Sequence, residues 1–386
     1  MTSDVYCTAP FNGIDIGTDG ILRTCCKAKT NLLDLNKNIV QNLETDLLST
    51  KLVEIQQYML QGKPHPENCN NCEYYEQSTR YQFNTYFPII DKTKLITPKF
   101  VLLRWSNFCN LSCVYCNDKY SSVWDQRIPI SSAKKSSYSF DNINRLIYDN
   151  INDVEELELQ GGEPLIEKKN YDIIRSLSHK TKLLIQTNLS YDLENLPCIQ
   201  DLLDRPNENV LWLVSVDNIG EQFEYVRNGA KWNQWKKNCK YLIKHWPDTV
   251  HVSFVYNIFS GFEISNTIKY LSYLGLRKFQ LLNFHNYYQY QEAFNIFNMP
   301  NEIKSKARDQ LLATVEWYQN FVHPEDRKFY QLMHADDILD KLLSPSEKVI
   351  TKQEFYHAIQ TTDNFTKNKF EQLWPNLKSL LDLHLQ

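Results

Sequence analysis

Three cysteines stand close together in the chain, at Cys109, Cys113 and Cys116, with the spacing CxxxCxxC. Thiolates are the usual ligands of iron–sulfur clusters, and a 4Fe-4S cluster normally takes four of them. Three cysteines on one short loop leave one iron without a protein ligand, and an open iron can chelate a small molecule through an amine and a carboxylate. A zinc knuckle is the alternative, although zinc sites usually pair one CxxC with another CxxC or with HxxxH. The spacing therefore favours an iron–sulfur cluster.

A predicted strand precedes the cysteine loop, and a glycine turn ends the next predicted strand. The apolar run 100–105 is typical of a strand, and so are residues 154–160. The second strand leads into a Gly-Gly-Glu-Pro turn made of Gly161, Gly162, Glu163 and Pro164. Glycines let a backbone approach a ligand closely. A Gly-Gly-Glu-Pro turn by itself is unspecific, and its position after the cysteine loop makes it informative.

The cysteine loop, with Tyr115 before its third cysteine and the glycine turn one strand later, resembles the radical S-adenosylmethionine (SAM) superfamily. The resemblance implies that a 4Fe-4S cluster on the loop binds SAM at its open iron. One electron from the cluster then cleaves SAM to a 5′-deoxyadenosyl radical. It also implies that Tyr115 offers its backbone to the adenine and its ring to shielding the cluster. The SAM ammonium group would find acceptors in the Glu163 carboxylate and in carbonyls of the glycine turn.

The ends of the third and fourth predicted strands carry further polar groups. Asn188 ends the third strand, Ser215 and Asp217 end the fourth, and Arg227 lies in the turn that follows. A strand-end Ser-x-Asp followed by an Arg-Gly-type turn resembles a pattern of the SPASM subfamily of radical SAM enzymes. The resemblance implies that Asn188 and Ser215 hold the ribose hydroxyls and that Arg227 pairs with the SAM carboxylate. Taken one at a time, such residues are more often caps or surface charges.

A second set of cysteines precedes the loop. Cys7 and Cys25 flank a predicted hairpin over 14–23 with Asp-Gly at its turn, and Cys69 and Cys72 form a CxxC. Four thiolates suffice for a closed cluster. The arrangement resembles the SPASM/twitch auxiliary-cluster domain, which usually follows the barrel, whereas this one precedes it. Because the further cysteines of a full SPASM domain are missing, we expect one auxiliary 4Fe-4S cluster. A zinc ribbon on the same thiolates is the alternative.

The choice between two adjacent cysteines stays open at this point. Cys25 fits the spacing of the auxiliary set, and Cys26 directly follows it. Cys198 and Cys239 lie in predicted helices without a partner and are typical of buried, inert cysteines.

Strands and helices alternate through the middle of the chain, which predicts parallel pairing and an α/β fold. We expect a partial (β/α)6 TIM-like barrel over 96–290, an auxiliary-cluster module over 1–95 and a helical extension over 291–386. Such a barrel binds its ligands at the carboxyl ends of its strands. The predicted strands are 100–105, 154–160, 182–188, 209–217, 250–258 and 278–284, and the predicted helices are 138–149, 167–178, 193–204, 231–245 and 262–274.

The residue that would remove a substrate proton is not evident from the sequence. Asp217, Tyr256 and His285 stand near the predicted strand ends and are the candidates for a catalytic base. His251 opens a predicted strand and is expected to be structural.

Composition limits the classes of function. The chain has 386 residues, of which 42% are hydrophobic, so it can form more than one packed domain. Its net charge is −4 with cations spread along the chain, which makes a nucleic-acid partner unlikely. No signal peptide or membrane-length apolar run is evident, and ten cysteines in so long a chain do not indicate a secreted disulfide scaffold. We therefore expect a cytoplasmic protein.

The resemblance implies an oxidoreductase that abstracts hydrogen from a substrate and receives its electron from a flavodoxin- or ferredoxin-type donor. An auxiliary cluster favours net oxidation, because it can take the electron that the substrate radical must lose. A peptide or protein that is oxidised or crosslinked is the first expectation, and dehydrogenation of a small molecule such as an aminosugar is the second. An electron carrier or zinc-binding protein without catalysis is the alternative from another class.

Overall fold

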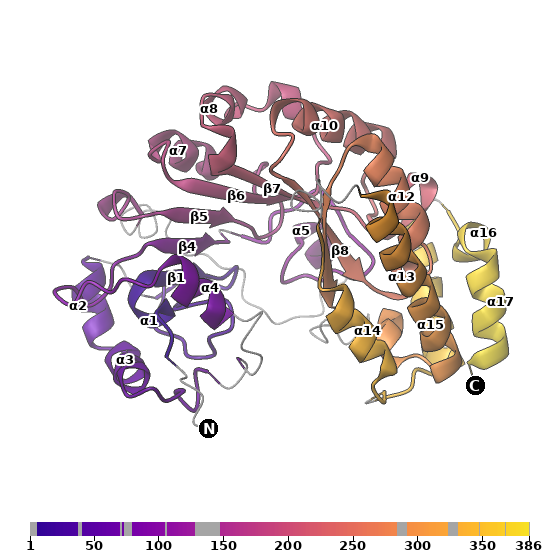
Figure 1. Ribbon diagram of the computed structural model, residues 1–386, viewed down its shortest axis with the longest axis horizontal. Coiled ribbons are helices and arrows are strands. Elements are labelled where there is room, and N and C mark those ends of the chain that lie inside the picture. The colour runs from indigo at the N-terminus through magenta and orange to yellow at the C-terminus, as the bar shows by residue number, and fades with distance from the viewer. Residues whose placement is uncertain are drawn as a thin grey trace. The chain divides into compact units, whose positions relative to one another are not determined.

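The computed structural model describes two compact units, each made of several stretches of the chain (Figure 1). Unit 1 comprises Met1–Phe108, Ile130–Gln186 and Gln200–Val210, and unit 2 comprises Cys109–Pro129, Thr187–Ile199 and Leu211–Gln386. The described residues are 6–37, 41–69, 72, 79–104, 106–127, 147–283, 292–322, 331–346, 348–366 and 368–385.

Unit 1 contains the hairpin that the sequence predicts, directly after its first helix. Strand β1 (Gly13–Ile16) pairs antiparallel with β2 (Ile21–Arg23), and β2 pairs antiparallel with β3 (Leu33–Asp34). The turn between β1 and β2 places Gly20 at φ 73°, a conformation that glycine adopts without steric cost. The prediction of a hairpin over 14–23 is confirmed.

The same hairpin joins a parallel sheet. β1 pairs with β4 (Phe100–Leu103), β4 pairs with β5 (Glu156–Leu159), and β5 pairs with β6 (Lys182–Thr187), all in parallel. The amphipathic helix α7 (Lys169–Ser176) connects β5 to β6 and buries Ile173 and Ile174. The N-terminal segment thus continues the sheet in which β4 leads to the cysteine loop.

Four helices accompany β1 in unit 1. They are α1 (Ala9–Asn12), α2 (Leu43–Leu48), α3 (Leu52–Leu60) and α4 (Thr79–Tyr86), and Figure 1 shows α1 and α4 beside β1. Cys7 and Cys25 pack against a buried cluster whose members are Ala9, Phe83, Phe87, Phe100 and Leu102. Burial of aromatic side chains stabilises such a cluster by about 2 kcal/mol or more per ring. Cys7 and Cys25 are therefore held against a well-packed hydrophobic cluster.

Unit 2 contains a second run of parallel strands. β7 (Val210–Ser215) pairs with β8 (Val250–Tyr256), β8 with β9 (Lys278–Asn283), and β9 with β10 (Gln331–Met333). The connecting helices are α9 (Gly220–Val226), α10 (Trp232–His245), α11 (Ile258–Gly261) and α12 (Ile264–Leu274), and α5 (Ser122–Arg127) follows the cysteine loop. These strands and helices, with β4 to β6, confirm the predicted α/β class, which is consistent with a partial TIM-like barrel.

The C-terminal region is helical, as predicted, with one exception. Its helices are α13 (Asn301–Phe321), α14 (Ala335–Leu343), α15 (Lys352–Asp363), α16 (Phe370–Leu373) and α17 (Pro375–His384). The exception is β10, which extends the sheet beside β9 and which the sequence did not predict. A strand of three residues is too short to show a period of two. No helix in the described part of the chain combines the length and the apolar character needed to cross a bilayer.

Two further helix predictions differ from the structure. The predicted helix 193–204 is divided into the 3-10 turn η1 (Leu193–Asn195) and α8 (Ile199–Leu203). Pro197 explains the break, because Leu196 before it is extended, at φ −66° and ψ 131°, as residues preceding proline prefer. Most of the predicted helix 138–149 lies outside the described residues.

Candidate functional site

The three-cysteine loop of unit 2 is held by backbone hydrogen bonds to the end of α9. The Ser112 N–H donates to the Asn228 carbonyl over 2.9 Å, and the Val114 N–H donates to the Val226 carbonyl over 2.8 Å. Cys109 and Cys113 are buried, each 9% exposed, and Cys116 is half-buried. Backbone hydrogen bonds within unit 2 therefore fix the position of the loop.

Helix α5 stabilises the other side of the loop. Trp124 Nε1 donates to the Cys113 carbonyl over 2.9 Å, and Ser121 Oγ donates to the Leu111 carbonyl over 2.6 Å. Buried carbonyls need such partners. Helix α5 and Ser121, which directly precedes it, thus satisfy two backbone carbonyls of the loop.

Burial, neighbouring thiols and nearby donors all act on the thiols of the loop. Burial raises the pKa of Cys113 and of Cys116, and the charges of Cys113 and Cys109 raise the pKa of Cys116 further. The three thiols are thus within electrostatic reach of one another. The Leu111 N–H donates to Cys109 Sγ over 3.4 Å, and Arg227 Nη1 lies 4.0 Å from Cys113 Sγ. Donors and a cation beside sulfur stabilise thiolate ligands, so this donor set fits an iron–sulfur cluster.

The described residues contain no group of three His, Cys, Asp or Glu side chains placed to hold a single metal ion.

A buried charge network links the loop to the strand ends. Tyr115 donates its hydroxyl hydrogen to Asp217 Oδ2 over 2.6 Å, and Arg227 Nε lies 3.0 Å from the same oxygen. The Val255 N–H donates to Asp217 Oδ1 over 2.9 Å. The Arg227 guanidinium also lies over the Tyr115 ring, 5.7 Å from its centroid. Both carboxylate oxygens of Asp217 are therefore engaged, in a side chain that is 0% exposed.

The sequence named these three residues and assigned them separate roles. Burial raises the pKa of Tyr115 well above its usual range, so the hydroxyl remains a hydrogen-bond donor. That Arg227 binds the SAM carboxylate, and that Asp217 acts as a base, stay predictions. The observed partners give Arg227 and Asp217 a structural role beside Cys113.

The other residues predicted at or near the strand ends are Asn188, Ser215, Tyr256 and His285. Asn188 Nδ2 donates to Asn110 Oδ1 over 2.9 Å and lies 3.8 Å from Cys109 Sγ, so it is beside the loop. Ser215 ends β7, and its carbonyl accepts from Trp235 Nε1 over 3.3 Å. Tyr256 is fully buried and donates to the Ala307 carbonyl over 3.3 Å. His285 lies outside the described residues.

The glycine turn of unit 1 packs tightly against the residues before Cys109. The Gly162 N–H donates to the Ser106 carbonyl over 3.1 Å, and the Glu163 N–H donates to the Phe108 carbonyl over 2.8 Å. A Cβ at Gly162 would stand 2.1 Å from the Phe108 carbonyl oxygen, and Gly161 has φ 117°. Both positions therefore need glycine.

The remaining members of this turn have partners within unit 1. Glu163 is 1% exposed and accepts at Oε1 from the Leu165 N–H over 3.1 Å. The Pro164 carbonyl accepts from Asn170 Nδ2 over 2.8 Å. The turn is thus braced from both sides.

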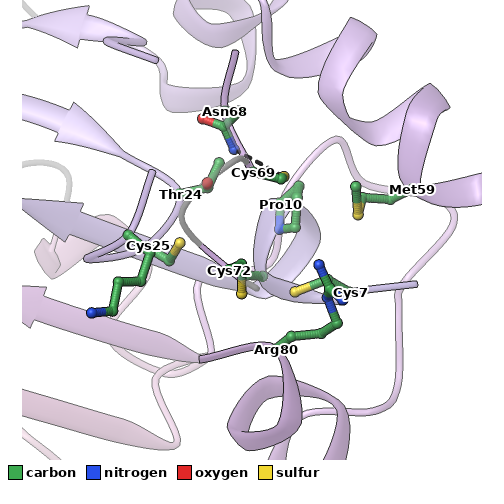
Figure 2. A pocket seen from close by; sticks show the side chains of 11 residues that line it. Cys7, Pro10, Thr24, Cys25, Met59, Asn68, Cys69, Cys72 and Arg80 are labelled. Atoms are coloured by element: carbon green, nitrogen blue, oxygen red, sulfur yellow. Dashed lines mark hydrogen bonds between the residues drawn. The ribbon is translucent and has the colours of Figure 1, made fainter. Parts of the chain in front are cut away.

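The four cysteines of the N-terminal set line one cavity of unit 1 (Figure 2). Cys7 precedes α1, Cys25 follows β2, and Cys69 and Cys72 lie in the segment after α3. Burial raises the pKa of the Cys7 thiol to about 12. Cys26 does not line the cavity and is exposed. The donor set fits a closed four-thiolate cluster, and Cys25 is the member of the adjacent pair that faces it.

Two residues of this cavity were missed by sequence reasoning. Asn68 Nδ2 lies 3.7 Å from Cys69 Sγ as a hydrogen-bond donor, shown as a dashed line in Figure 2. Arg80, from the first turn of α4, is 7% exposed and lines the same cavity. Asn68 precedes the CxxC and could have been noticed, whereas nothing in the sequence singles out Arg80.

Residues 103–271 match the sequence model of the radical SAM superfamily. This segment is a radical SAM domain. It runs from the end of β4 into α12 and includes the three-cysteine loop, the glycine turn and the strand-end residues Asn188, Ser215 and Asp217. The four cysteines around the cavity of unit 1 precede it. No curated protein matches the chain.

Several solved structures resemble the chain. One is "Native anSMEcpe with bound AdoMet and Kp18Cys peptide", at 18% identity and TM-score 0.41 over 57% of this chain and 60% of that one. Another is Streptococcus suis SuiB bound to precursor peptide SuiA, at 14% identity and TM-score 0.41 over 86% of this chain and 72% of that one. A third is TYW1 with a lysine-pyruvate adduct, at 10% identity and TM-score 0.38 over 64% and 79%. The chain thus spans about 60% of the length of the first of these structures.

Proposed function

We propose that this protein is a radical SAM enzyme that cleaves SAM reductively and abstracts a hydrogen atom from its substrate. The observation that carries the proposal is the match of residues 103–271 to the superfamily together with the CxxxCxxC loop inside the matched segment. The buried thiols of that loop, with Arg227 beside Cys113, support it. When bound, a 4Fe-4S cluster and SAM supply the electron and the 5′-deoxyadenosyl radical.

The chain's own residues position and shield that chemistry. The backbone bonds at Ser112 and Val114 fix the loop, and the buried Asp217–Arg227 pair places a cation beside Cys113. In this proposal the glycine turn and Glu163 receive the methionyl end of SAM. The ribose is held by Asn188 and Ser215, and the adenine by the backbone at Tyr115. The position of Asn188 supports its part in this proposal, because its side-chain amide lies beside Cys109.

The four cysteines of the unit 1 cavity hold one closed auxiliary 4Fe-4S cluster in this proposal. Four thiolates leave no open iron, which suits electron transfer better than substrate binding. The substrate carbon first loses a hydrogen atom to the radical. The resulting carbon-centred radical then loses one proton to a base and one electron to the auxiliary cluster. The net result is a two-electron oxidation, which appears in the product as a new double bond or a crosslink.

We propose a peptide or protein as the substrate and a flavodoxin- or ferredoxin-type protein as the electron donor. Both follow from the resemblance to auxiliary-cluster radical SAM enzymes. A small molecule is the other substrate class for the same chemistry. Incubation of the enzyme with short peptides encoded near its gene distinguishes the two classes, because only a peptide-modifying enzyme would change the mass of one of them.

Anaerobic reconstitution with iron and sulfide, followed by incubation with SAM and a one-electron reductant, tests the proposal. Release of 5′-deoxyadenosine and methionine is expected. Iron-loaded protein that leaves SAM intact would show that the proposed function is wrong. Zinc in place of iron at the N-terminal cysteines would show that the auxiliary cluster is not part of the proposed function.

A further inference from the structure

The cavity of the four N-terminal cysteines is lined by cations and contains a buried one. Its described lining includes two charged side chains, Lys27 and Arg80, and no carboxylate. Lys27 is exposed, whereas Arg80 is 7% exposed. Arg80 Nε has no hydrogen-bond partner among the described residues. Buried guanidinium groups are normally paired with an anion, and the cysteines that line this cavity would supply negative charge as thiolates.

Asn68 presents a hydrogen-bond donor to one sulfur of the same cavity. The side chain is 4% exposed, and its amide Nδ2 donates to Cys69 Sγ over 3.7 Å. Its carbonyl Oδ1 accepts from the Thr30 N–H over 3.3 Å, which fixes which end of the amide faces the cysteine. Hydrogen bonds to sulfur and nearby net charge are two of the properties that set the reduction potential of an iron–sulfur cluster.

We propose that Arg80, assisted by Asn68, raises the reduction potential of the auxiliary cluster and so makes it an electron acceptor. The inference rests on the proposed function, in which the four cysteines hold that cluster. Reduction adds one negative charge to a group that already carries four thiolates. A buried cation stabilises the reduced state more than the oxidised state, because charges interact strongly where water is excluded. The electron comes from the carbon-centred substrate radical, which releases one proton as it is oxidised.

Arg80 is a positioning and tuning residue in this account, so the test measures a potential. The parent protein is the full chain with Cys109, Cys113 and Cys116 changed to Ala, which leaves the auxiliary cluster as the single redox centre. Its midpoint potential is measured by reductive titration followed by electron paramagnetic resonance. We expect Arg80→Gln to make reduction at least tenfold less favourable, which is a shift of about 59 mV to more negative potential for one electron.

Two further variants serve as controls. One tests whether the charge of residue 80 matters, and the other tests whether a cation of this cavity must be buried to act. Arg80→Lys keeps the charge and should retain most of the parent potential. Lys27→Gln removes a cation from the same cavity, and its shift should be smaller because solvent screens the exposed Lys27. An equal shift in both Gln variants would contradict the role of burial. An unchanged potential in Arg80→Gln at full iron content would overturn the inference.

If Arg80→Gln does not retain iron, Asn68→Ala decides the question in the same titration. A negative shift is expected there, and no shift overturns the inference. A parent protein that binds no iron would instead show that the proposed auxiliary cluster does not exist. If the parent binds iron and neither Arg80→Gln nor Asn68→Ala shifts its potential, the proposed function stands and only the role of Arg80 and Asn68 is removed.

Discussion

Arg227 and Asp217 form a buried ion pair, with 3.0 Å between Arg227 Nε and Asp217 Oδ2 and side chains that are 6% and 0% exposed. The pair lies between the cysteine loop and the strand ends, because Tyr115 and Val255 both donate to the same carboxylate. It connects α9, β8 and the loop through one charged group. A buried pair of this kind is costly to break, since the remaining partner is left without compensation.

Changing Asp217 to Asn should therefore destabilise the protein although the shape is retained. Arg227 would remain buried and charged without its partner, which costs about 3–5 kcal/mol. The free energy of unfolding in urea measures the loss. Asp248→Asn is the matched control, because Asp248 pairs with Arg277 over 3.4 Å at the surface and is 63% exposed. The control should lose about 1 kcal/mol or less. Equal losses in the two variants would contradict the account of the pair.

Gly162→Ala should disturb the residues that lead into Cys109. The new Cβ would stand 2.1 Å from the Phe108 carbonyl oxygen, so the backbone must shift, at a cost of about 1–3 kcal/mol. Less iron after reconstitution and weaker SAM binding are expected. Gly220→Ala is the control, since a Cβ there meets nothing within 4 Å although φ is +60°. Iron content and SAM affinity that remain normal in Gly162→Ala would argue against a role of this turn in the site.

Replacing both Cys69 and Cys72 with Ala should remove about half of the bound iron, as expected for two clusters of one type. SAM cleavage in the absence of substrate turnover should continue, because the loop at Cys109 keeps its ligands. Product formation should stop, because the electron has no acceptor. Cys26→Ala is the control, since Cys26 is exposed and does not line the cavity. Full iron content in the double variant would exclude these cysteines as ligands.

His251 makes stability depend on pH. Burial, together with the charge of Lys278, its register partner on β9, lowers the pKa of His251 from 6.5 to about 4. The unfolded chain therefore binds a proton below pH 6.5 that the folded chain accepts only near pH 4. The free energy of unfolding is therefore unaffected by His251 above pH 6.5. It falls as the pH drops from 6.5 to 4, by up to roughly 3 kcal/mol.

His251→Gln should make the loss of stability between pH 6.5 and 4 smaller by that amount. Urea unfolding at several pH values measures it, with the exposed His179→Gln as control. If wild type and His251→Gln show the same pH dependence, His251 is accessible to protons in the folded state.

Local sequence patterns were sufficient to predict the regular core. The runs at 182–188 and 250–258 are strands in the structure, within two residues at their ends, because apolar positions there repeat with a strand period. Cysteine spacing likewise indicated which thiols would meet, and Cys7 and Cys72 line one cavity although 64 residues separate them.

The interactions that the sequence did not reveal are long-range or lack a pattern. Arg80 belongs to the cysteine cavity through the placement of α4, and no spacing rule connects it with Cys7. Asp217 and Arg227 were each named, yet their pairing depends on how α9 follows β7. The break at Pro197 follows from proline chemistry, because the residue before a proline avoids the helical conformation.

Formation of 5′-deoxyadenosine by two proteins measured side by side tests the central claim most directly. Both the wild type and the Cys109→Ala, Cys113→Ala, Cys116→Ala variant are reconstituted with iron and sulfide and given SAM and a one-electron reductant. Cys239→Ala, which removes a fully buried thiol from α10, serves as control. We predict 5′-deoxyadenosine from the wild type and from the control, and none above background from the triple variant. Undiminished 5′-deoxyadenosine from the triple variant would contradict the assignment of these three cysteines to the SAM-cleaving cluster.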